Sequence, residues 1–238
     1  MYFSASKTRN YVNEVLQQLS QSPSLLDRVD VFIVPDHVTL TSVISQLEGT
    51  IIMAGAQDTF YEDSGAFTGE VSPAVLAEVG CRVVEVGHAE RRRMFGETDK
   101  DVARKAAAIS RNGMIPLVCI GERTRGEVHT AVDECLVQVE AVIATVSDDA
   151  EVVLAYEPVW AIGAAQPASA DHVVRVTQDI MKSDCIRRRK GHTRIIYGGS
   201  AGPGLFDKLK DGVDGLFLGR FAHEPSQFYQ TIQDVASA

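Results

Sequence analysis

Short apolar segments alternate with amphipathic segments along the whole chain, and this alternation constrains the fold more than any other feature. The apolar segments consist almost entirely of apolar residues, and they are 31–35, 51–55, 83–87, 116–121, 152–156, 193–199 and 215–219. Continuous apolar runs of this length are typical of parallel strands that are buried on both faces. Between them, apolar residues recur at the spacing of helices, as at 132, 135, 139, 142 and 146.

The segments between the predicted strands carry the end signals of helices. We expect helices over about 8–20, 39–48, 73–80, 98–113, 128–146, 169–182, 203–210 and 225–235. Ser72 and Pro73 are a typical N-cap and first helical residue, and Thr98 with Asp101 resembles a capping box. No linker, repeat or low-complexity stretch divides residues 1–238, so we expect a single domain.

This order of elements fits an α/β fold, either a (β/α)8 TIM barrel or a doubly wound parallel sheet. Chemically functional residues follow nearly every strand, which favours the barrel, because active sites of barrels collect at the C-terminal ends of the strands. A closed barrel of this kind needs eight strands, whereas seven are found and the chain opens almost directly into a helix. We therefore expect a barrel whose first strand is largely missing, with Met1–Phe3 at the tail of that strand.

The composition argues against several kinds of partner. A net charge of −9 argues against nucleic-acid binding, and the 45% of apolar residues among the 238 are enough for a large core. No apolar run has membrane-spanning length and the N-terminal residues do not resemble a signal peptide, so we expect a cytoplasmic protein without membrane contact. The four cysteines form no CxxC pair and the six histidines show no metal-ligand spacing, so we expect reduced thiols and no metal.

Glu157 directly follows the 152–156 segment, and Pro158 ends that strand. A carboxylate at the mouth of a parallel barrel strand is placed to act as a base, although an isolated Glu more often caps a helix or pairs with an Arg. The segment 158–167 that follows contains small residues between two prolines and the only tryptophan, Trp160. This composition indicates a lid over an active site.

His88 follows the 83–87 segment and opens a densely charged stretch that ends at Glu97. We expect the arginines of this stretch and Glu97 to form a structural ion-pair network. His88 would share the mouth of the barrel with Glu157, and a base and a hydrogen-bond donor that face one substrate can move a proton beside a carbonyl.

Two glycine-rich segments, 197–204 and 215–220, include the ends of the last two predicted strands. In barrels, the loops after these strands commonly bind phosphate through backbone N–H groups, which glycine leaves open to close approach. Glycines after strands are often only turns, so each segment alone is weak evidence. Both segments in succession predict a phosphate site.

The chain resembles the triosephosphate isomerase family over nearly its whole length. The matching segments are, in chain order, AQD…GAFTGEVS (56–72), VGHAERRRMFGE (86–97), CIGE (119–122), AYEPVWAIG (155–163), YGGSA (197–201) and DGLFLG (214–219). The resemblance implies an aldose–ketose isomerase that interconverts dihydroxyacetone phosphate and glyceraldehyde 3-phosphate without a cofactor, in glycolysis and gluconeogenesis.

The resemblance also implies roles for single residues in the reaction. Glu157 would be the base that moves a proton between two carbons, neutral His88 would polarise the carbonyl, and Glu90 would be a supporting carboxylate. The groups implied to bind the substrate phosphate are Gly163, Ser200, Gly219 and Arg220.

A homodimer is the partner that the resemblance implies, apart from the small phosphorylated sugar. The loop 57–70 would form the interface, with Gln57 in it and with Thr68 reaching toward the site of the neighbouring subunit.

Several residues depart from the family pattern. The Asn and the catalytic Lys of the first strand do not appear in the sequence, and the segment after CIGE is shorter than usual. In the lid, Ala165 and Gln166 replace a Gly and a Lys of the family. Ala89 stands where Ser is usual and Asp58 where Asn is usual, and we expect modest effects of both.

Arg220 is a further departure, because the family usually has a second Gly there. The sequence LGRFA around it, with PASAD at 167–171, is similar to the erythrulose-phosphate isomerase branch of the superfamily, which acts on four-carbon sugar phosphates. Two alternatives to the triose reaction therefore remain open: isomerisation of erythrulose phosphate, and a non-catalytic homologue that binds phosphosugars.

Overall fold

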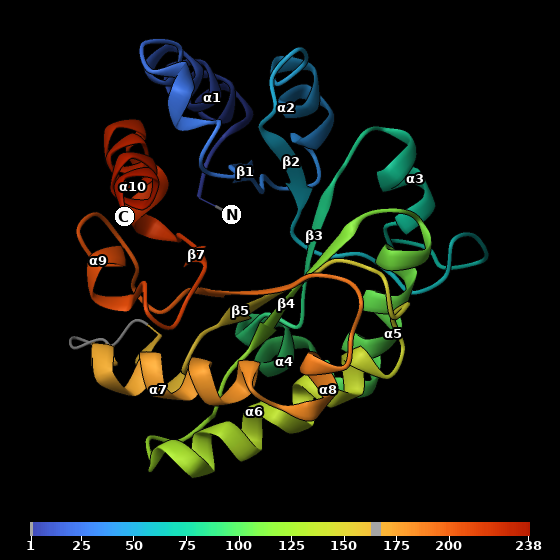
Figure 1. The fold of residues 1–238 in the computed structure, drawn as a ribbon. Helices are drawn as coiled ribbons and strands as arrows, with labels where there is room; N and C mark the ends of the chain where they lie inside the picture. Colours follow the sequence, from blue (N-terminus) through green and yellow to red (C-terminus); the bar gives the residue numbers. More distant parts are fainter. Residues whose placement is uncertain (1, 163–167) are drawn as a thin grey trace.

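Seven parallel strands form one curved sheet with helices around it in a computed structural model, which describes residues 2–162 and 168–238 (Figure 1). The strands lie side by side in their order along the chain, from β1 to β7. Their bounds are β1 Phe32–Ile33, β2 Met53–Ala56, β3 Val83–Val86, β4 Ile115–Ile120, β5 Val152–Tyr156, β6 Thr193–Tyr197 and β7 Gly215–Leu216. This is the α/β barrel arrangement that the alternation of segments predicts.

The helices cover the outside of the curved sheet (Figure 1). Their bounds are α1 Ala5–Ser20, α2 Leu40–Gln46, α3 Pro73–Glu78, α4 Ala89–Phe95, α5 Asp99–Arg111, α6 Val128–Ile143, α7 Ala170–Met181, α8 Asp184–Arg187, α9 Phe206–Leu209 and α10 Pro225–Ser237. Three short 3-10 turns are η1 Pro23–Leu25, η2 Val159–Ala161 and η3 Arg220–His223. The predicted caps are confirmed, since Ser72 Oγ accepts a hydrogen bond from Val75 N and Thr98 with Asp101 forms a capping box.

Several predicted boundaries are wrong. The first helix begins at Ala5 rather than Thr8 because Ser4 Oγ caps it by accepting a hydrogen bond from Lys7 N. The strand predicted over 193–199 ends at Tyr197, and Gly198 already belongs to the turn beyond it. The helix predicted over 203–210 occupies only Phe206–Leu209.

Helix α4 was not expected, because its sequence is so densely charged that it was interpreted only as an ion-pair cluster. It is a helix with His88 as its N-cap, and it ends where Gly96 adopts a left-handed backbone conformation with φ of 70°. Short helix α8 was also absent from the sequence prediction.

The two edges of the sheet are β1 and β7, which are not hydrogen-bonded to each other. Their side chains approach across the opening, with the rings of Phe32 and Phe217 6.3 Å apart. Tyr2 and Phe3 were expected at the tail of a strand, but they lie outside any strand and their rings contact His223.

The core has two parts, one inside the barrel and one between the sheet and the helices. The inner cluster comprises Val83, Leu117, Cys119, Val153, Ala155 and Ile196. The larger outer cluster includes Val84 and Val86 of β3. Both faces of the strands are therefore buried, which explains why their sequences are apolar without alternation. None of the described helices combines the length and the apolar character needed to cross a membrane.

Candidate active site at the carboxyl ends of the strands

Glu157 lies one residue past the end of β5, with its backbone N–H still donating to the carbonyl of Ile120 at 2.8 Å. The residue is only 7% exposed, and its Oε2 has no hydrogen-bond partner in the described part of the chain. Two glycines make room for it. A Cβ on Gly198 would lie 2.4 Å from Glu157 Oε1, and a Cβ on Gly121 would lie 2.0 Å from the Glu157 carbonyl oxygen.

His88 meets Glu157 across the mouth of the barrel. Its Nε2 lies 3.6 Å from Glu157 Oε2, as the sequence interpretation requires. Its Nδ1 accepts a hydrogen bond from the backbone N–H of Glu90 at 3.3 Å. In the neutral ring the hydrogen is therefore on Nε2, which points the only N–H of the imidazole toward the space beside Glu157.

Burial sets the protonation of both groups. Burial, reinforced by the nearby Glu85 and Glu90, raises the pKa of Glu157 to about 8. Burial lowers the pKa of His88, and Arg93 adds to this, although Glu90 opposes it. A carboxylate with a raised pKa is a stronger base, and a histidine with a lowered pKa stays neutral at pH 7.

The residues predicted to bind phosphate follow β6 and β7, at the same end of the sheet as Glu157. Ser200 has a φ of 57°, the one positive φ at a non-glycine among the described residues, and such strain is typical of functional sites. Gly219 is the exposed residue before η3, and Arg220 is its exposed first residue. Gly163 lies outside the described residues, as do Ala165 and Gln166 of the lid.

Glu90 contacts His88 mainly through its backbone. Its side chain is 63% exposed, and Glu90 Oε2 lies 3.8 Å from His88 Nδ1. Its role as a supporting carboxylate stays a prediction. The loop 57–70 projects beyond α3 in Figure 1, with Gln57 and Thr68 exposed. Gln57 Nε2 donates to the carbonyl of Val34 at 3.2 Å.

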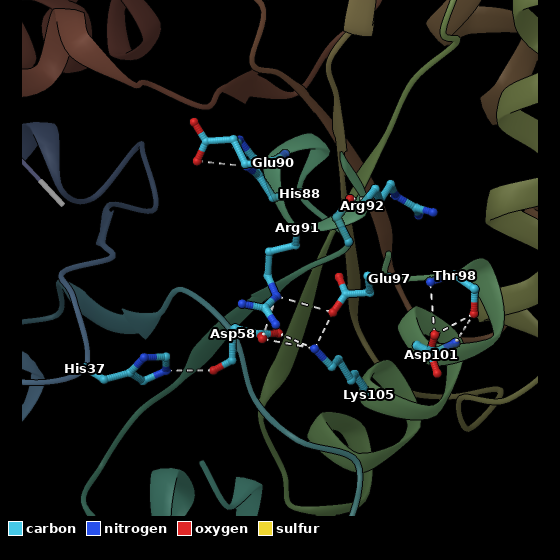
Figure 2. A network of polar contacts seen from close by, with 11 residues as sticks. His37, Asp58, His88, Glu90, Arg91, Arg92, Glu97, Thr98, Asp101 and Lys105 are labelled. Atoms are coloured by element: carbon cyan, nitrogen blue, oxygen red, sulfur yellow. Dashed lines mark hydrogen bonds and ion pairs between the residues drawn. The ribbon is translucent and has the colours of Figure 1, made fainter. Parts of the chain in front are cut away.

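The charged stretch after His88 forms the ion-pair network that its sequence predicts (Figure 2). Asp58 accepts from Lys105 Nζ at 2.8 Å and lies 2.7 Å from Arg91 Nε. Glu97 contacts both cations, at 3.3 Å in the case of Arg91. Arg92 Nε donates to the carbonyl of Gly87 at 2.7 Å. The network joins the loop after β2 to α4 and α5, and so fixes the helix that carries His88.

Two buried carboxylates were not identified from the sequence. Glu122, 1% exposed, accepts hydrogen bonds from Tyr156 Oη at 3.0 Å and Trp160 Nε1 at 2.8 Å, and lies 3.1 Å from His172 Nε2. It thereby ties together residues on both sides of the lid segment. Glu85, 8% exposed, lies within β3. Its signal in the sequence is a single charged residue inside an otherwise apolar strand. A charged side chain is rarely buried in such a strand without a function.

The fold is an α/β barrel with a histidine and a buried carboxylate facing each other at the carboxyl ends of its strands. The profile of triosephosphate isomerase matches residues 1–235, so the chain belongs to the triosephosphate isomerase family.

This chain is similar to curated relatives that fall into two groups with different activities. An L-erythrulose-1-phosphate isomerase of Pectobacterium atrosepticum is 44% identical over 96% of this chain and 90% of its own length. A triosephosphate isomerase of Streptococcus thermophilus is 40% identical over 88% of this chain and 86% of its own length. A second L-erythrulose-1-phosphate isomerase, from Mesorhizobium japonicum, is 37% identical over 91% of this chain and 87% of its own length. These relatives are all isomerases of short sugar phosphates.

Proposed function

We propose that this protein isomerises a short-chain ketose phosphate, with Glu157 as the base and His88 as the hydrogen-bond donor to the carbonyl. The observation that carries the proposal is the approach of His88 Nε2 to 3.6 Å from a buried, otherwise unpartnered carboxylate oxygen of Glu157. A base and a donor at this separation can hold a carbon acid and its carbonyl oxygen at the same time.

The reaction begins when the Glu157 carboxylate removes the proton from the hydroxylated carbon beside the carbonyl. His88 Nε2–H donates to the carbonyl oxygen, where negative charge develops as the enediolate forms. His88 then helps to move the proton between the two oxygens. Glu157 returns its proton to the former carbonyl carbon, and the carbonyl has moved by one position. Every proton that leaves the substrate is returned to it, so this cycle needs no cofactor.

The substrate that we favour is the four-carbon ketose L-erythrulose 1-phosphate. Support comes from the relative from Pectobacterium atrosepticum, which matches more of this chain at higher identity than the streptococcal triosephosphate isomerase. The sequence LGRFA around Arg220, which is similar to the erythrulose-phosphate isomerase branch, supports the same substrate. The triose phosphates remain the second candidate, because the triosephosphate isomerase relative is also 40% identical.

The remaining roles belong to the same proposal. Backbone and side-chain groups of Gly163, Ser200, Gly219 and Arg220 would bind the phosphate dianion. The protein would act in the cytoplasm as a homodimer through the loop 57–70, and with triose substrates it would serve glycolysis and gluconeogenesis.

The test is turnover of L-erythrulose 1-phosphate and of glyceraldehyde 3-phosphate by the purified protein and by the variant Glu157→Gln. We expect the variant to lose about 10³-fold or more in kcat, because general-base catalysis contributes about 10²–10⁴-fold. The matched control is Glu140→Gln, which removes an exposed carboxylate of α6 and should leave kcat unchanged.

Two results would contradict the proposal. Undiminished turnover by Glu157→Gln would show that another group is the base. A folded wild-type protein that turns over neither sugar phosphate would instead support the non-catalytic, phosphosugar-binding alternative. Circular dichroism and the thermal midpoint of each variant would show that a loss of turnover is not a loss of folding.

A further inference from the structure

Glu85 points into the barrel. Its neighbours Val84 and Val86 belong to the core under the helices, whereas Val83 belongs to the cluster inside the barrel. Because alternate residues of a strand face opposite sides, the Glu85 side chain shares the inner face with Val83. Its contact there is with an inward-facing thiol, since Glu85 Oε1 lies 3.7 Å from Cys119 Sγ.

Glu85 lacks the partners that buried carboxylates usually have. Among the described residues, the buried carboxylates are Asp58, Glu85, Glu122 and Glu157. Asp58 is paired with Lys105, and Glu122 accepts from Tyr156 and Trp160, so both are satisfied within the fold. The charged groups that act on Glu85 are themselves acidic, Asp58 and Glu90. Burying a carboxyl group without a cation or a strong hydrogen-bond donor costs free energy of folding, unless another group, such as a ligand, bonds to it.

The position of Glu85 relative to the substrate follows from the strand order. The proposed phosphate groups follow β6 and β7, and the reacting carbons must lie between His88 after β3 and Glu157 after β5. A substrate that is anchored by its phosphate near β6 and β7 therefore directs its other end toward β3. Glu85 is the inward-facing residue of β3 three positions before His88. It is thus a polar group at the end of the site that lies away from the phosphate.

The two candidate substrates differ at this end. In L-erythrulose 1-phosphate the phosphate occupies the oxygen on C1, so the enediolate formed from the C2 ketone spans C2 and C3. The C4 hydroxymethyl group then extends beyond the reacting carbons, on the side opposite the phosphate. A triose phosphate has no carbon at that position. Discrimination between the two substrates therefore requires a group that recognises a terminal hydroxyl next to the proton-transfer site.

We propose that Glu85 is the specificity-determining residue of this site and binds the terminal hydroxyl of a four-carbon substrate inside the barrel. This assignment rests on the proposed isomerase function and deepens it. A carboxylic acid can donate one hydrogen bond to the hydroxyl oxygen and accept another from the hydroxyl hydrogen. Burial raises the pKa of Glu85 to about 8, so the neutral acid predominates at pH 7. In this form Glu85 does not place a second negative charge beside Glu157.

The experiment compares two unreactive polyol phosphates, erythritol 4-phosphate with four carbons and glycerol 3-phosphate with three, by isothermal titration calorimetry. The proteins are the wild type, Glu85→Leu and Glu85→Gln. We expect the wild type to bind the four-carbon ligand with a Kd about tenfold lower than that of the three-carbon ligand, since one buried hydrogen bond contributes about that factor. Glu85→Leu should remove the preference, and Glu85→Gln, which keeps a donor and an acceptor, should retain most of it.

The outcomes separate this assignment from the function on which it rests. A wild-type protein without the preference, a Glu85→Leu variant that keeps it, or a variant that weakens both ligands equally would overturn the role of Glu85. Turnover of L-erythrulose 1-phosphate by the wild type tests the function independently. In kinetics, Glu85→Leu should lower kcat/KM for the four-carbon substrate about tenfold more than for glyceraldehyde 3-phosphate. A leucine enters an apolar cluster, and a thermal melt reports whether the variant is folded.

Discussion

Burial gives Glu157 and His88 opposite protonation preferences although they face each other across one site. Taking a carboxylate out of water disfavours its charged form and raises its pKa, whereas the same environment lowers the pKa of an imidazole. The pair is therefore suited to a reaction in which the carboxylate accepts a proton from carbon and the neutral imidazole donates a hydrogen bond. At the scale of the residue, the catalytic rate should therefore depend on pH in a defined way.

We expect kcat/KM to rise with pH and to level off only above about pH 8. The base must be ionised to act, and the pKa of Glu157 in the free enzyme is raised from 4.5 to about 8. Below that value the rate should fall about tenfold per pH unit, as expected for one essential ionisation. His88 adds no acid limb in this range because its pKa is lowered and the ring is neutral.

The measurement is kcat/KM between pH 5.5 and 9 in buffers of constant ionic strength. A profile that stays flat from pH 9 down to pH 5.5 would show that Glu157 is better solvated than its burial indicates. Glu140→Gln serves as the control for an exposed carboxylate of α6, and its profile should match that of the wild type.

At the scale of the element, the end of β6 determines where the base can lie. The chain leaves the sheet after Tyr197, and Gly198 then passes so close to Glu157 that no side chain fits between them. The YGG sequence was interpreted as part of a phosphate loop. Its first glycine also has a second role, which is to leave space for the carboxylate that ends the neighbouring strand β5.

We expect Gly198→Ala to lower kcat by about 10²-fold while the protein still folds, because a displacement of about 1 Å in a catalytic group can have an effect of that size. The added Cβ would lie 2.4 Å from Glu157 Oε1, so the carboxylate must move. Gly126→Ala is the matched control, since the nearest atom to a Cβ there is the carbonyl oxygen of Thr124 at 4.0 Å. Activity of Gly198→Ala equal to that of the control would contradict the expected constraint.

Helix α4 shows how an element can be concealed by its charges. The stretch after His88 has too few apolar residues to give a helical stripe, so the hydrophobic period does not reveal it. The helix is stabilised instead by contacts with other elements. Arg91 reaches Asp58 of the loop after β2, and Arg92 reaches Asp99 at the start of α5. Those partners are 33 and 7 positions away in the sequence, so only the folded chain brings the first pair together.

At the scale of the whole molecule, the loop 57–70 is the surface feature that the barrel itself does not explain. It projects beyond α3 and exposes Phe67, whose exposed fraction is 41%. Thr68 next to it is also exposed. An exposed aromatic residue on a projecting loop is typical of an interface.

We expect the protein to be a homodimer with twice the mass of the 25.8 kDa chain in light scattering at micromolar concentration. Thr68→Arg should shift it toward the monomer, because a long cation would be buried in the interface without a partner. Val137→Arg is a control on an exposed apolar residue of α6, and it should leave the mass unchanged. A wild-type protein with the mass of a single chain would contradict the dimer.

Much of the fold and of the site could be predicted from the sequence because the signals are local. The strands were located by their continuous apolar runs, and Glu157 and His88 by their places directly after two of them. The exact ends of β6 and α9 could not be predicted, since they depend on close approaches between segments. Glu85 was missed because a strand that is buried on both faces does not reveal which of its residues point into the barrel.

The sequence by itself determined the order of strands and helices, the buried character of the sheet, and the two residues that we propose face the substrate. These properties follow from hydrophobic pattern and from chain position, which act over a few residues. The tertiary structure decided the 3.6 Å approach of His88 to Glu157, the pairing of Asp58 with Lys105, and the isolation of Glu85 inside the barrel. Each of these depends on strands and helices that close around one axis, because burial and proximity between distant segments exist only after the chain has packed.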